Sequence, residues 1–528
     1  MAVNTHPVDV VIMAAGKGTR MKSGLPKVLH RLAGRALLQH VVDTAATLLA
    51  RRVVVITGHG AIEVEASLAH LTRAEGLNDL KFDAKSDAMA DAKDGAGSTI
   101  RADLKAFFRR RSLADANFDL KFVRQEPQLG TGHAVQQAVP ALAGDGIVVV
   151  LSGDVPLTQP DTLRQLIAAC GGNKLALLTL ELANPGGYGR IVRSGTATPG
   201  NDIPDTGNGA SRKFDDLPVV AIIEQKDASD AQRQIREIYS GIMAVPAARL
   251  KAWLARLDNQ NAQGEYYLTD IVKFAVADGV PVVGYKIDDE TQVAGVNSPV
   301  QLAELERAYQ RRLAHRFMEQ GVRLADPARF DVRGDLQCGE DVSIDVNCVF
   351  EGQVSLGEGV KIGANCVIAN ARIAANAVIH PFTHIDGEKA GVTVGAGALV
   401  GPFARLRPGA RLGDEVHIGN FVEVKNSTLA KGAKANHLAY LGDATVGERV
   451  NYGAGSITAN YDGAFKHQTV IEADVHIGSN CVLVAPVTIG AGGTVGGGST
   501  ITKDTPPGAL SVARGRQVMI ANWKRPAK

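Results

Sequence analysis

Short apolar runs alternate with helical patterns over the first 297 residues. The runs VDVVI, RRVVVITG and DGIVVVLSGD are β-rich, and the amphipathic stretch HRLAGRALLQHVVDTAATLLA separates the first two. A strand, a helix and a second strand at this spacing predict a parallel sheet with helices on both faces. Ligands of such sheets bind outside the carboxyl ends of the strands. We therefore expect the chemistry of this part of the chain to lie in the loops that follow the apolar runs.

A single helix is predicted where this alternation ends. Ser298 is a suitable N-cap, Pro299 occupies the first helical position and Gln301 the third. Gly321 is a suitable stop. Between them lies one apolar stripe, formed by Leu302, Leu305, Tyr309, Leu313 and Phe317. The pattern predicts a linker helix over 298–321.

Beyond residue 321, apolar residues recur every six positions. Six is neither a helical period nor the two-residue period of a simple strand, and it is typical of a β-helix built from hexapeptide repeats. Stacked coils bury a row of side chains that no single repeat buries alone. Three runs keep the period: Ile344, Phe350, Leu356, Ile362 and Ile368; Val394, Val400, Leu406, Leu412, Ile418 and Val424; and Ile477, Leu483, Ile489, Val495 and Ile501. The sequence thus predicts three parts, 1–297, 298–321 and 322–528.

Two stretches interrupt the first part, and both are interpreted as surface insertions. Residues 72–117 are polar and helix-prone, and residues 194–216 are rich in Gly, Pro, Asp and Asn. The triplet RRR at 109–111 is interpreted as a solvated helix face, not a nucleic-acid patch.

The overall composition restricts the partners of the chain. Its 57 basic and 55 acidic residues leave a formal charge of +2, so no global field favours nucleic acid or an anionic membrane. The N-terminus lacks a basic region and its apolar run breaks at Gly16, which argues against a signal peptide or a membrane span. Five widely spaced cysteines without a CxxC motif fit a reducing compartment. We therefore expect a cytoplasmic protein.

Three loops of the first part carry candidate chemistry. The turn MAAGKGTRMKSGLPKVL combines glycines with Lys17, Arg20 and Lys27 between a strand and a helix, where an anion is favoured. It is neither a Walker A loop nor a good dinucleotide fingerprint. The loop QEPQLGTGHA at 125–134 offers amides suited to a base edge, and LSGDVPL places Asp154 at a strand end, where a carboxylate can hold magnesium. A turn that holds the phosphates of a nucleotide is the favoured interpretation.

The β-helical part carries polar residues that hexad packing does not need. They lie in FARLRPGA, HIGNFVEVKN, ANHLAYLGD, RVNYGAG and TANYDG. Arg407 and Lys425 could hold a second phosphate, and the unperturbed pKa of His437 suits proton removal at neutral pH.

These motifs together resemble one bacterial enzyme family over nearly the whole chain. GKGTRM, LPKVL, QLGTGHA, GDVPL, GYGRI, QGEYYLTD and the hexapeptide repeats are similar to bifunctional N-acetylglucosamine-1-phosphate uridylyltransferase and glucosamine-1-phosphate N-acetyltransferase. The resemblance implies an α/β, Rossmann-like nucleotidyltransferase domain, a linker helix and a left-handed parallel β-helix. It also implies supply of UDP-N-acetylglucosamine for cell-wall (peptidoglycan) and lipopolysaccharide precursors.

For the first part, the resemblance implies uridylyl transfer from UTP to N-acetylglucosamine-1-phosphate with release of pyrophosphate. Arg20 and Lys27 would steady the phosphates as catalytic residues, and Asp154 with Asn297 would bind Mg²⁺. The positions implied in binding UTP or UDP-N-acetylglucosamine are Met13, Ala14, Gly16, Lys27, Gln125, Gly130, Thr131, Asp154, Gly189, Glu224, Tyr239 and Asn297. Ser152 stands where the family often has tyrosine, and Tyr239 where an asparagine often contacts the nucleotide sugar. Sugar selectivity is therefore less well defined than reaction type.

For the second part, the resemblance implies acetyl transfer from acetyl-CoA to glucosamine-1-phosphate. His437 would be the general base, oriented by Glu423. The implied glucosamine-1-phosphate contacts are Arg407, Lys425, Tyr440, Asn451, Asn460 and Tyr461, and the implied acetyl-CoA contacts are Ala454, Ser479, Gly497 and Arg514. Gly497 replaces a frequent alanine. Family members are homotrimers with acetylation sites between neighbouring β-helices, so a homotrimer is implied.

Three alternatives stay open at this point. The chain could be a single-function sugar-1-phosphate nucleotidyltransferase whose β-helix regulates or assembles it. A purely structural or binding role has least support, because it leaves both sets of loops unexplained. The third alternative is a zinc site, of the kind that some β-helical hydratases form from histidines between subunits, with the candidate ligands His380, His384, His417, His437 and His476.

Overall fold

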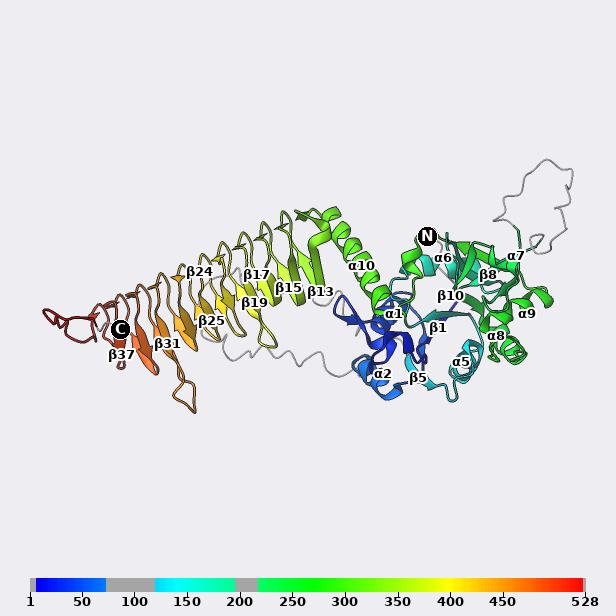
Figure 1. The fold of residues 1–528 in the computed structure, drawn as a ribbon, viewed down its shortest axis with the longest axis horizontal. Coiled ribbons are helices and arrows are strands. Elements are labelled where there is room, and N and C mark those ends of the chain that lie inside the picture. The colour runs from blue at the N-terminus through cyan, green and yellow to red at the C-terminus, as the bar shows by residue number, and fades with distance from the viewer. Residues whose placement is uncertain (1–5, 73–118, 195–216, 526–528) are drawn as a thin grey trace. The chain divides into compact units, whose positions relative to one another are not determined.

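The structure is a computed structural model that describes residues 6–72, 119–194 and 217–525. The two predicted insertions lie outside the described residues, except for their first residues. The chain divides into two compact units, 1–305 and 306–528, and the division falls inside helix α10 (Pro299–Glu319). Ser298 Oγ accepts a hydrogen bond from the Gln301 N–H, and Gly321 follows the helix with φ +93°. Figure 1 shows an α/β fold in unit 1 and a solenoid in unit 2.

Unit 1 is built on a sheet to which its described residues contribute nine strands. Seven strands form the main path in the order β11-β7-β10-β6-β1-β4-β5, and β8 and β9 extend it from β10. The strands are β1 (Val8–Met13), β4 (Arg52–Thr57), β5 (Asp119–Arg124), β6 (Ile147–Ser152), β7 (Leu175–Glu181), β8 (Gly189–Arg193), β9 (Val219–Ile223), β10 (Glu237–Pro246) and β11 (Val282–Lys286).

The direction of β10 differs from the predicted all-parallel sheet. Strands β6, β1, β4 and β5 are parallel, but β10 runs antiparallel to both β6 and β7. A continuously apolar strand has the same sequence pattern whether it runs parallel or antiparallel to its neighbours. The direction of β10 is therefore set by the preceding strands β8 and β9 and not by its own pattern. As a result, the beginning of β10 lies beside the carboxyl end of β6, where we expect the chemistry.

Helices cover both faces of this sheet, as predicted. Val10 and Ile12 face one core with α1 (Leu37–Ala46) and α6 (Pro160–Cys170), whereas Val11 faces the opposite core. That second core is covered by α5 (Thr131–Ala138), α8 (Ala247–Leu254) and α9 (Ile271–Ala277). The shorter helices are α2 (Ala61–Ser67), α3 (Ala69–Thr72) and α7 (Asp230–Arg233). The strict alternation of side chains along β1 thus places the sheet between two helical layers.

The first helix is shorter than its sequence pattern predicts. The stretch from 30 to 36 forms a tight hairpin of β2 (Arg31–Leu32) and β3 (Arg35–Ala36), and α1 starts only at Leu37. Ala33 and Gly34 turn the chain with φ of 50° and 81°. A left-handed pair of this kind is incompatible with helix continuation, so the turn outweighs the amphipathic pattern.

Unit 2 is a solenoid of parallel coils. Its strands stack into three ladders with parallel pairing throughout, which confirms the predicted parallel β-helix. The first ladder comprises β12 (Arg323–Leu324), β14 (Ser343–Ile344), β16 (Lys361–Ile362), β18 (Val378–Ile379), β21 (Leu399–Val400), β24 (His417–Asn420), β27 (Lys434–His437), β30 (Asn451–Tyr452), β33 (His476–Ile477), β36 (Thr494–Val495) and β38 (Leu510–Ser511).

The other two ladders share their first coils. Long strands β13 (Phe330–Cys338), β15 (Cys348–Leu356) and β17 (Val367–Ile373) span both faces before they separate. The second ladder continues through β19 (His384–Asp386), β22 (Arg405–Leu406), β25 (Glu423–Lys425), β28 (Tyr440–Gly442), β31 (Ile457–Ala459), β34 (Val482–Val484) and β37 (Thr500–Ile501). The third continues through β20 (Val392–Val394), β23 (Arg411–Leu412), β26 (Thr428–Leu429), β29 (Ala444–Val446), β32 (Thr469–Ile471) and β35 (Val487–Ile489).

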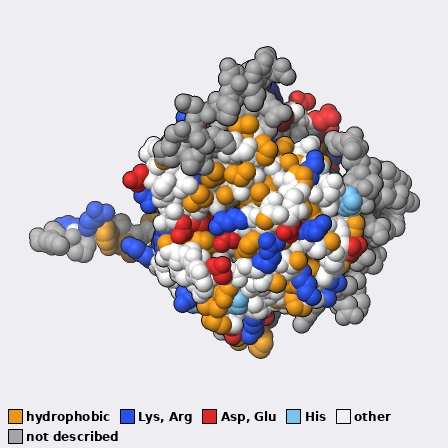
Figure 2. All heavy atoms as spheres, turned by 90° about the vertical axis from the view of Figure 1, so that its right-hand side faces the viewer, with side chains coloured by type: hydrophobic (Ala, Val, Ile, Leu, Met, Phe, Trp, Pro, Cys, Tyr) orange, Lys and Arg blue, Asp and Glu red, His pale blue; other side chains and the backbone are white. Residues whose placement is uncertain are grey.

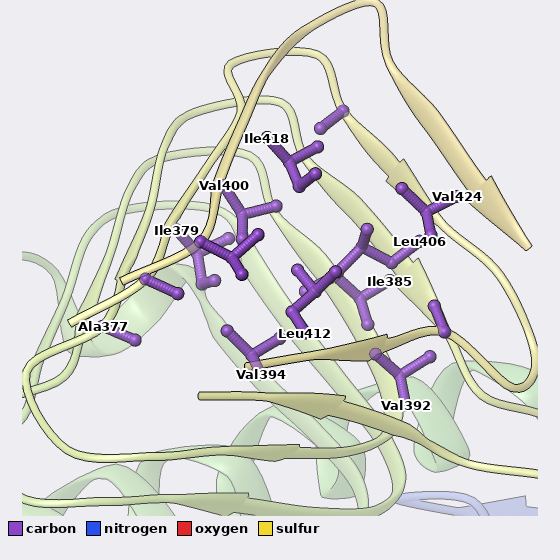
Figure 3. Packing of buried hydrophobic residues seen from close by; sticks show 14 of the residues in the cluster. Ala377, Ile379, Ile385, Val392, Val394, Val400, Leu406, Leu412, Ile418 and Val424 are labelled. Atoms are coloured by element: carbon purple, nitrogen blue, oxygen red, sulfur yellow. The ribbon is translucent and has the colours of Figure 1, made fainter. Parts of the chain in front are cut away.

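The six-residue period of the sequence determines which side chains pack in the interior of this solenoid. Every residue of the three predicted hexad runs is at most 5% exposed. Figure 3 shows Ile379, Ile385 and Val394 entering the interior from three sides, with the following coils repeating the arrangement. The hexad prediction is confirmed.

Helix α10 covers the first coil of the solenoid. Leu313, Ala314 and Phe317 join the solenoid core, so the helix shields apolar surface that a first coil leaves open. Gln310 is 2% exposed; its Nε2 donates to the Val332 carbonyl at 2.8 Å, and its Oε1 accepts from the Val332 N–H at 2.9 Å. One amide side chain thus satisfies both backbone groups of a strand residue.

The surface agrees with the balanced charge of the sequence. On the face in Figure 2, basic and acidic side chains are interspersed with apolar ones, and neither sign forms a continuous field. Among the described residues, every helix is too short or too polar to span a bilayer. All five cysteines lie among the described residues and are free.

The Gln310 bridge gives a stability prediction. Replacing Gln310 by Leu leaves the buried N–H and carbonyl of Val332 unpaired, which should lower the free energy of unfolding by about 2–5 kcal/mol. Chemical denaturation of the full chain, followed by circular dichroism, measures the loss. Gln320→Leu is the control, because Gln320 lies exposed just beyond the helix. Equal stability of both variants would contradict the bridge.

Candidate active sites

A lysine, an aspartate and an asparagine meet at the carboxyl end of β6. Lys27 lies in a short 3-10 turn (Lys27–Leu29), Asp154 two residues beyond β6, and Asn297 two residues before α10. The Lys27 ammonium donates to Asp154 Oδ2 at 2.5 Å and to Asn297 Oδ1 at 3.2 Å. The Val296 N–H donates to the Asp154 carbonyl at 3.0 Å, which ties the two loops together. Three segments far apart in sequence therefore converge on one cation.

This convergence fits a magnesium site. Asp154 and Asn297 present one carboxylate and one amide oxygen to the same positive charge, and oxygens of these types are the ligands that Mg²⁺ prefers. Mg²⁺ commonly takes only one or two protein ligands and fills its other positions with water and substrate phosphates. The Asp154 side chain is 18% exposed, so solvent and substrate can reach it.

The glycine-rich turn lies against Lys27. Gly18 adopts φ +61°, and a Cβ on it would lie 2.5 Å from the Lys27 Cβ, so only glycine fits there. The Met13 carbonyl accepts the Gly153 N–H at 2.9 Å, which places Met13 and Ala14 beside the Asp154 loop. Gly16 and Arg20 are exposed in the same turn, and no ion pair joins Arg20 to Asp154 within the described part of the chain.

The second predicted loop is held by its own side chain and by a third segment. Gln125 is 4% exposed, and its Nε2 donates to the Gly130 carbonyl at 2.9 Å. Its amide therefore shapes the loop, although it was predicted to contact a base. The N–H of Leu268 donates to Thr131 Oγ1 at 3.1 Å, and Gly132 donates to the Tyr266 carbonyl at 2.7 Å. The motif QGEYYLTD thus anchors this loop.

A third group lies where β8, β9 and β10 meet. Gly189 pairs with Tyr239 across the strands, and a Cβ on Gly189 would lie 3.7 Å from Glu224 Oε1. Glu224 Oε1 accepts from Thr269 Oγ1 at 3.0 Å. Burial raises the pKa of the Glu224 carboxyl, and neighbouring carboxylates raise it further. Gly189, Glu224 and Tyr239 are thus brought together.

On the solenoid, His437 is exposed and oriented by an asparagine. It ends β27, and its Nδ1 lies 2.8 Å from Asn420 Oδ1 on the preceding coil. An amide oxygen only accepts, so Nδ1 carries the proton and Nε2 is left free to take one. The orienting residue is Asn420, and not Glu423 as expected.

Small residues continue the column below His437. Successive coils pair Lys434 with Asn451, Asn451 with His476, and His476 with Thr494. On each of these coils, the residue three positions after the paired one lies at the same corner of the solenoid. From coil to coil these corner residues are Asn420, His437, Ala454, Ser479 and Gly497. Arg514 Nη1 donates to the Gly497 carbonyl at 2.9 Å and closes the column. We call this set the corner row.

Cationic side chains gather on the second ladder beside the corner row. Arg407 donates to Glu423 at 2.8 Å, and Arg405 approaches the same carboxylate at 3.4 Å. Glu423 is therefore engaged with arginines, which explains why it does not orient His437. Contact with Lys466 lowers the pKa of Lys425, and partial burial and the charge of Arg407 lower it further. Lys425 and Lys466 hold two positive charges close together, and a bound anion would neutralise their repulsion.

The other predicted glucosamine-phosphate contacts fall into two places. Asn460 is 8% exposed and donates to Asp443, and Tyr461 is 61% exposed at the start of the protruding loop that carries Lys466. A pocket of about 350 Å³ lies beside that loop, lined by Arg411, Asn426, Thr428, Asp443, Lys466 and His467 among others. Tyr440 lies on the second ladder, whereas Asn451 lies on the first. The predicted residues thus occupy two faces of the solenoid.

A zinc site within one chain is not supported, whereas zinc shared between subunits stays an open alternative. Across residues 6–72, 119–194 and 217–525, no three His, Cys, Asp or Glu side chains come together in a way that could hold a metal ion. His417 lies beside Lys434, and burial together with that charge lowers its pKa.

Two residues that contribute to these groups were not predicted from the sequence. Asn420 lies in HIGNFVEVKN and Lys466 in the loop after TANYDG, but neither spacing indicates contact with His437 or Lys425. A count of coil registers could have found Asn420, since it lies one coil before His437.

The fold and both residue groups define a class: a nucleotidyltransferase domain joined to a hexapeptide-repeat transferase. The MobA-like NTP transferase domain family matches residues 10–190, and the bacterial transferase hexapeptide family matches 335–370, 391–426 and 468–503. Within this class, the chain belongs to the family of the bifunctional protein GlmU, which confirms the resemblance inferred from its motifs.

The similarity extends over 99% of this chain. The bifunctional protein GlmU of Polaromonas sp. (strain JS666 / ATCC BAA-500) is 72% identical over 522 residues, covering 99% of this chain and 98% of that protein. That of Albidiferax ferrireducens is 70% identical and covers 99% and 100%. Among solved structures, a UDP-glucose pyrophosphorylase complexed with UDP-glucose matches 58% of this chain and 99% of its own, with a TM-score of 0.40 and 16% identity.

The lysine pair gives a prediction that needs no activity assay. Lys466→Met removes the neighbouring ammonium, so the pKa of Lys425 should rise toward its ordinary value. An NMR titration of isotopically methylated lysines measures it. Lys431→Met is the control, because Lys431 pairs with Glu415 instead. An unchanged Lys425 pKa in Lys466→Met would contradict the contact.

Proposed function

We propose that this chain makes UDP-N-acetylglucosamine in two steps. Unit 2 acetylates glucosamine-1-phosphate with acetyl-CoA, and unit 1 then transfers uridylyl from UTP to N-acetylglucosamine-1-phosphate. The observation that carries the proposal is the pair of separate, chemically distinct groups in one GlmU-family chain: Lys27, Asp154 and Asn297 in unit 1, and the corner row in unit 2.

In unit 1, the work of the protein is alignment and charge neutralisation. A phosphate oxygen of the sugar phosphate attacks the α-phosphorus of UTP, and pyrophosphate leaves. Lys27 and Arg20 offset negative charge on the phosphates. Met13, Ala14, Gly16, Gln125, Gly130 and Thr131 form the two loops that bind the nucleotide, and Gly189 and Glu224 face the sugar. No covalent enzyme intermediate is needed.

Asp154 and Asn297 would hold Mg²⁺ in this site. When bound, Mg²⁺ supplies charge neutralisation and orientation of the phosphates. Lys27 contacts both oxygens, and its ammonium would offset negative charge on phosphates bound beside them.

In unit 2, His437 acts as the general base. Its Nε2 takes a proton from the amine of glucosamine-1-phosphate as the nitrogen attacks the thioester carbonyl. The new C–N bond replaces the C–S bond, and coenzyme A leaves as the thiol. Asn420 fixes the tautomer that this step needs. Arg407, Lys425 and Lys466 form the phosphate clamp. Tyr440, Asn451, Asn460 and Tyr461 lie on two faces of the solenoid, so they contact the sugar from neighbouring β-helices of the trimer.

The corner row supports the path of acetyl-CoA. Ala454, Ser479 and Gly497 have small side chains in line with His437, so a slender chain can lie along them and present a thioester to the base. Arg514 at the end of the row offers a cation to the phosphates of the coenzyme.

A homotrimer is part of this proposal. An aromatic ladder of Phe382, Phe403 and Phe421 stacks along the solenoid with centroid distances of 5.0 and 5.4 Å, and its members are 47–56% exposed. Each has φ between 54° and 62°, the left-handed turn conformation that the same corner of other coils shows at Asn365 and Leu438. Phe421 directly follows Asn420. A neighbouring β-helix packed on this ladder would also bring its own residues to His437.

The substrates UTP and acetyl-CoA support a location in the cytoplasm, where both are made, and the product UDP-N-acetylglucosamine supports a role upstream of peptidoglycan and lipopolysaccharide synthesis. Small sugar phosphates and nucleotides are its partners, with no role for nucleic acid or membrane. The single-function alternative leaves the orientation of His437 by Asn420 without purpose, and the relatives are named bifunctional proteins.

Two variants should separate the activities. His437→Ala should lower acetyl transfer at least about 100-fold while leaving uridylyl transfer intact, since it removes only the base. Asp154→Ala should lower uridylyl transfer by about 100-fold or more and spare acetyl transfer. Thiol release from acetyl-CoA and pyrophosphate release from UTP measure the two steps. Loss of both activities in either folded variant would contradict two independent sites.

The aromatic ladder predicts the oligomeric state. Phe403→Ser should reduce the mass of the trimer toward that of the monomer at micromolar concentration and lower acetyl transfer in parallel. Light scattering after size exclusion measures the mass. Leu49→Ser is the control, because Leu49 is a single apolar residue of unit 1 that is 91% exposed. A trimeric Phe403→Ser variant would show that the ladder is not the contact.

A further inference from the structure

Three polar residues stack at one corner of the solenoid beside the proposed phosphate clamp. Asn426, Asp443 and Asn460 directly follow the strands β25, β28 and β31 of the second ladder, and each is 17 residues from the next. The pairing of Lys425 with Gly442 sets the first two of them side by side on neighbouring coils. We call Asn426, Asp443 and Asn460 the polar stack.

The carboxylate of Asp443 joins the other two members of the polar stack. Its Oδ1 accepts a hydrogen bond from Asn426 Nδ2 at 2.5 Å, and its Oδ2 accepts one from Asn460 Nδ2 at 2.5 Å. An ionised carboxylate only accepts hydrogen bonds, so both amides must turn their NH₂ groups toward it. Asp443 thus fixes which way each amide points.

This orientation has its main consequence at Asn460. The Asn460 side chain is 8% exposed, whereas Asn426 is exposed to solvent. Because its NH₂ group is turned to Asp443, Asn460 keeps its amide oxygen as an acceptor, and no described residue donates to that oxygen. The hydroxyl and amine groups of an amino sugar are donors that such an oxygen can pair with.

Asp443 lies among three predicted contacts of the sugar phosphate without being one itself. Its N–H donates to the carbonyl of Lys425 at 3.2 Å, Tyr440 begins the strand that ends just before it, and Asn460 donates to its carboxylate. Lys466 and partial burial lower the pKa of Lys425, and the negative charge of Asp443 opposes that shift. The carboxylate is therefore close to the clamp.

We propose that Asp443 is a positioning residue for acetyl transfer, which holds the Asn460 amide so that its oxygen accepts a hydrogen bond from the amino-sugar phosphate. The proposal rests on the acetyl transfer assigned above and deepens it. Asp443 itself touches no substrate, so the effect of its loss on substrate binding must pass through Asn460.

Asp443→Gly tests the proposal. Asp443 has φ +50°, which glycine adopts without strain, so the substitution removes the carboxylate and leaves the turn intact. We expect the KM for glucosamine-1-phosphate to rise about five- to tenfold with kcat within about twofold, which is the signature of a lost binding contact. Thiol release from acetyl-CoA by the full chain measures both. An unchanged KM would overturn the proposal.

Asn426→Gly is the matched control. Asn426 also has a positive φ, of 44°, and its removal breaks the other hydrogen bond of the same carboxylate while Asn460 stays bound to Asp443. Its KM should stay within about twofold of the wild type. An equal rise in KM for Asn426→Gly and Asp443→Gly would show that the polar stack only supports the local fold, and would overturn the positioning role.

A double-mutant cycle shows whether Asp443 acts through Asn460. In an Asn460→Ala background, Asp443→Gly should raise KM no further, because the amide that it orients is already missing. Effects on KM that multiply independently would contradict the proposal. If the wild type itself releases no thiol with glucosamine-1-phosphate, the proposed function fails. If the wild type is active but Asp443→Gly keeps its KM, only the inference about Asp443 fails.

Discussion

Successive coils of the solenoid pair in parallel at a fixed register, and this backbone constraint decides which side chains of unit 2 can meet. It places the imidazole of His437 under Asn420 and above Ala454, although these residues belong to three different coils. The sequence spacing hides the arrangement. Ala454 and Ser479 are 25 residues apart, whereas Ser479 and Gly497 are 18 apart, because a protruding loop lengthens one coil without disturbing the ladder. Hydrogen bonding between coils thus converts irregular sequence positions into one straight row.

Unit 1 reaches a comparable result by a different route. Parallel strands end at one edge of the sheet, so the loops after β1 and β6 and the segment before α10 deliver Lys27, Asp154 and Asn297 to one place. Glycines allow the close approach, as at Gly18 against Lys27. Because the two units each complete their own group of residues, the chain can hold two chemistries with separate charge environments.

Patterns that report local burial were predictable from sequence. The hexads, the cap of α10 by Ser298 and the position of Asp154 after a buried strand all follow from local periodicity. Features that depend on distant partners or on an unrecognised tight turn were not. The sense of β10 is set by β8 and β9, the hairpin at Gly34 overrides a helical pattern, and Glu423 is drawn to Arg407 instead of His437. Sequence periodicity reports burial and not bound ligands, so it does not identify which side chains contact substrate.

The most direct test of the account is a crystal structure of the full chain with coenzyme A and glucosamine-1-phosphate. The account predicts that the pantetheine arm follows Ala454, Ser479 and Gly497, with the thiol beside His437 and the sugar phosphate between Arg407 and Lys425. Coenzyme A bound away from this corner of the solenoid, with His437 remote from the sugar amine, would contradict it.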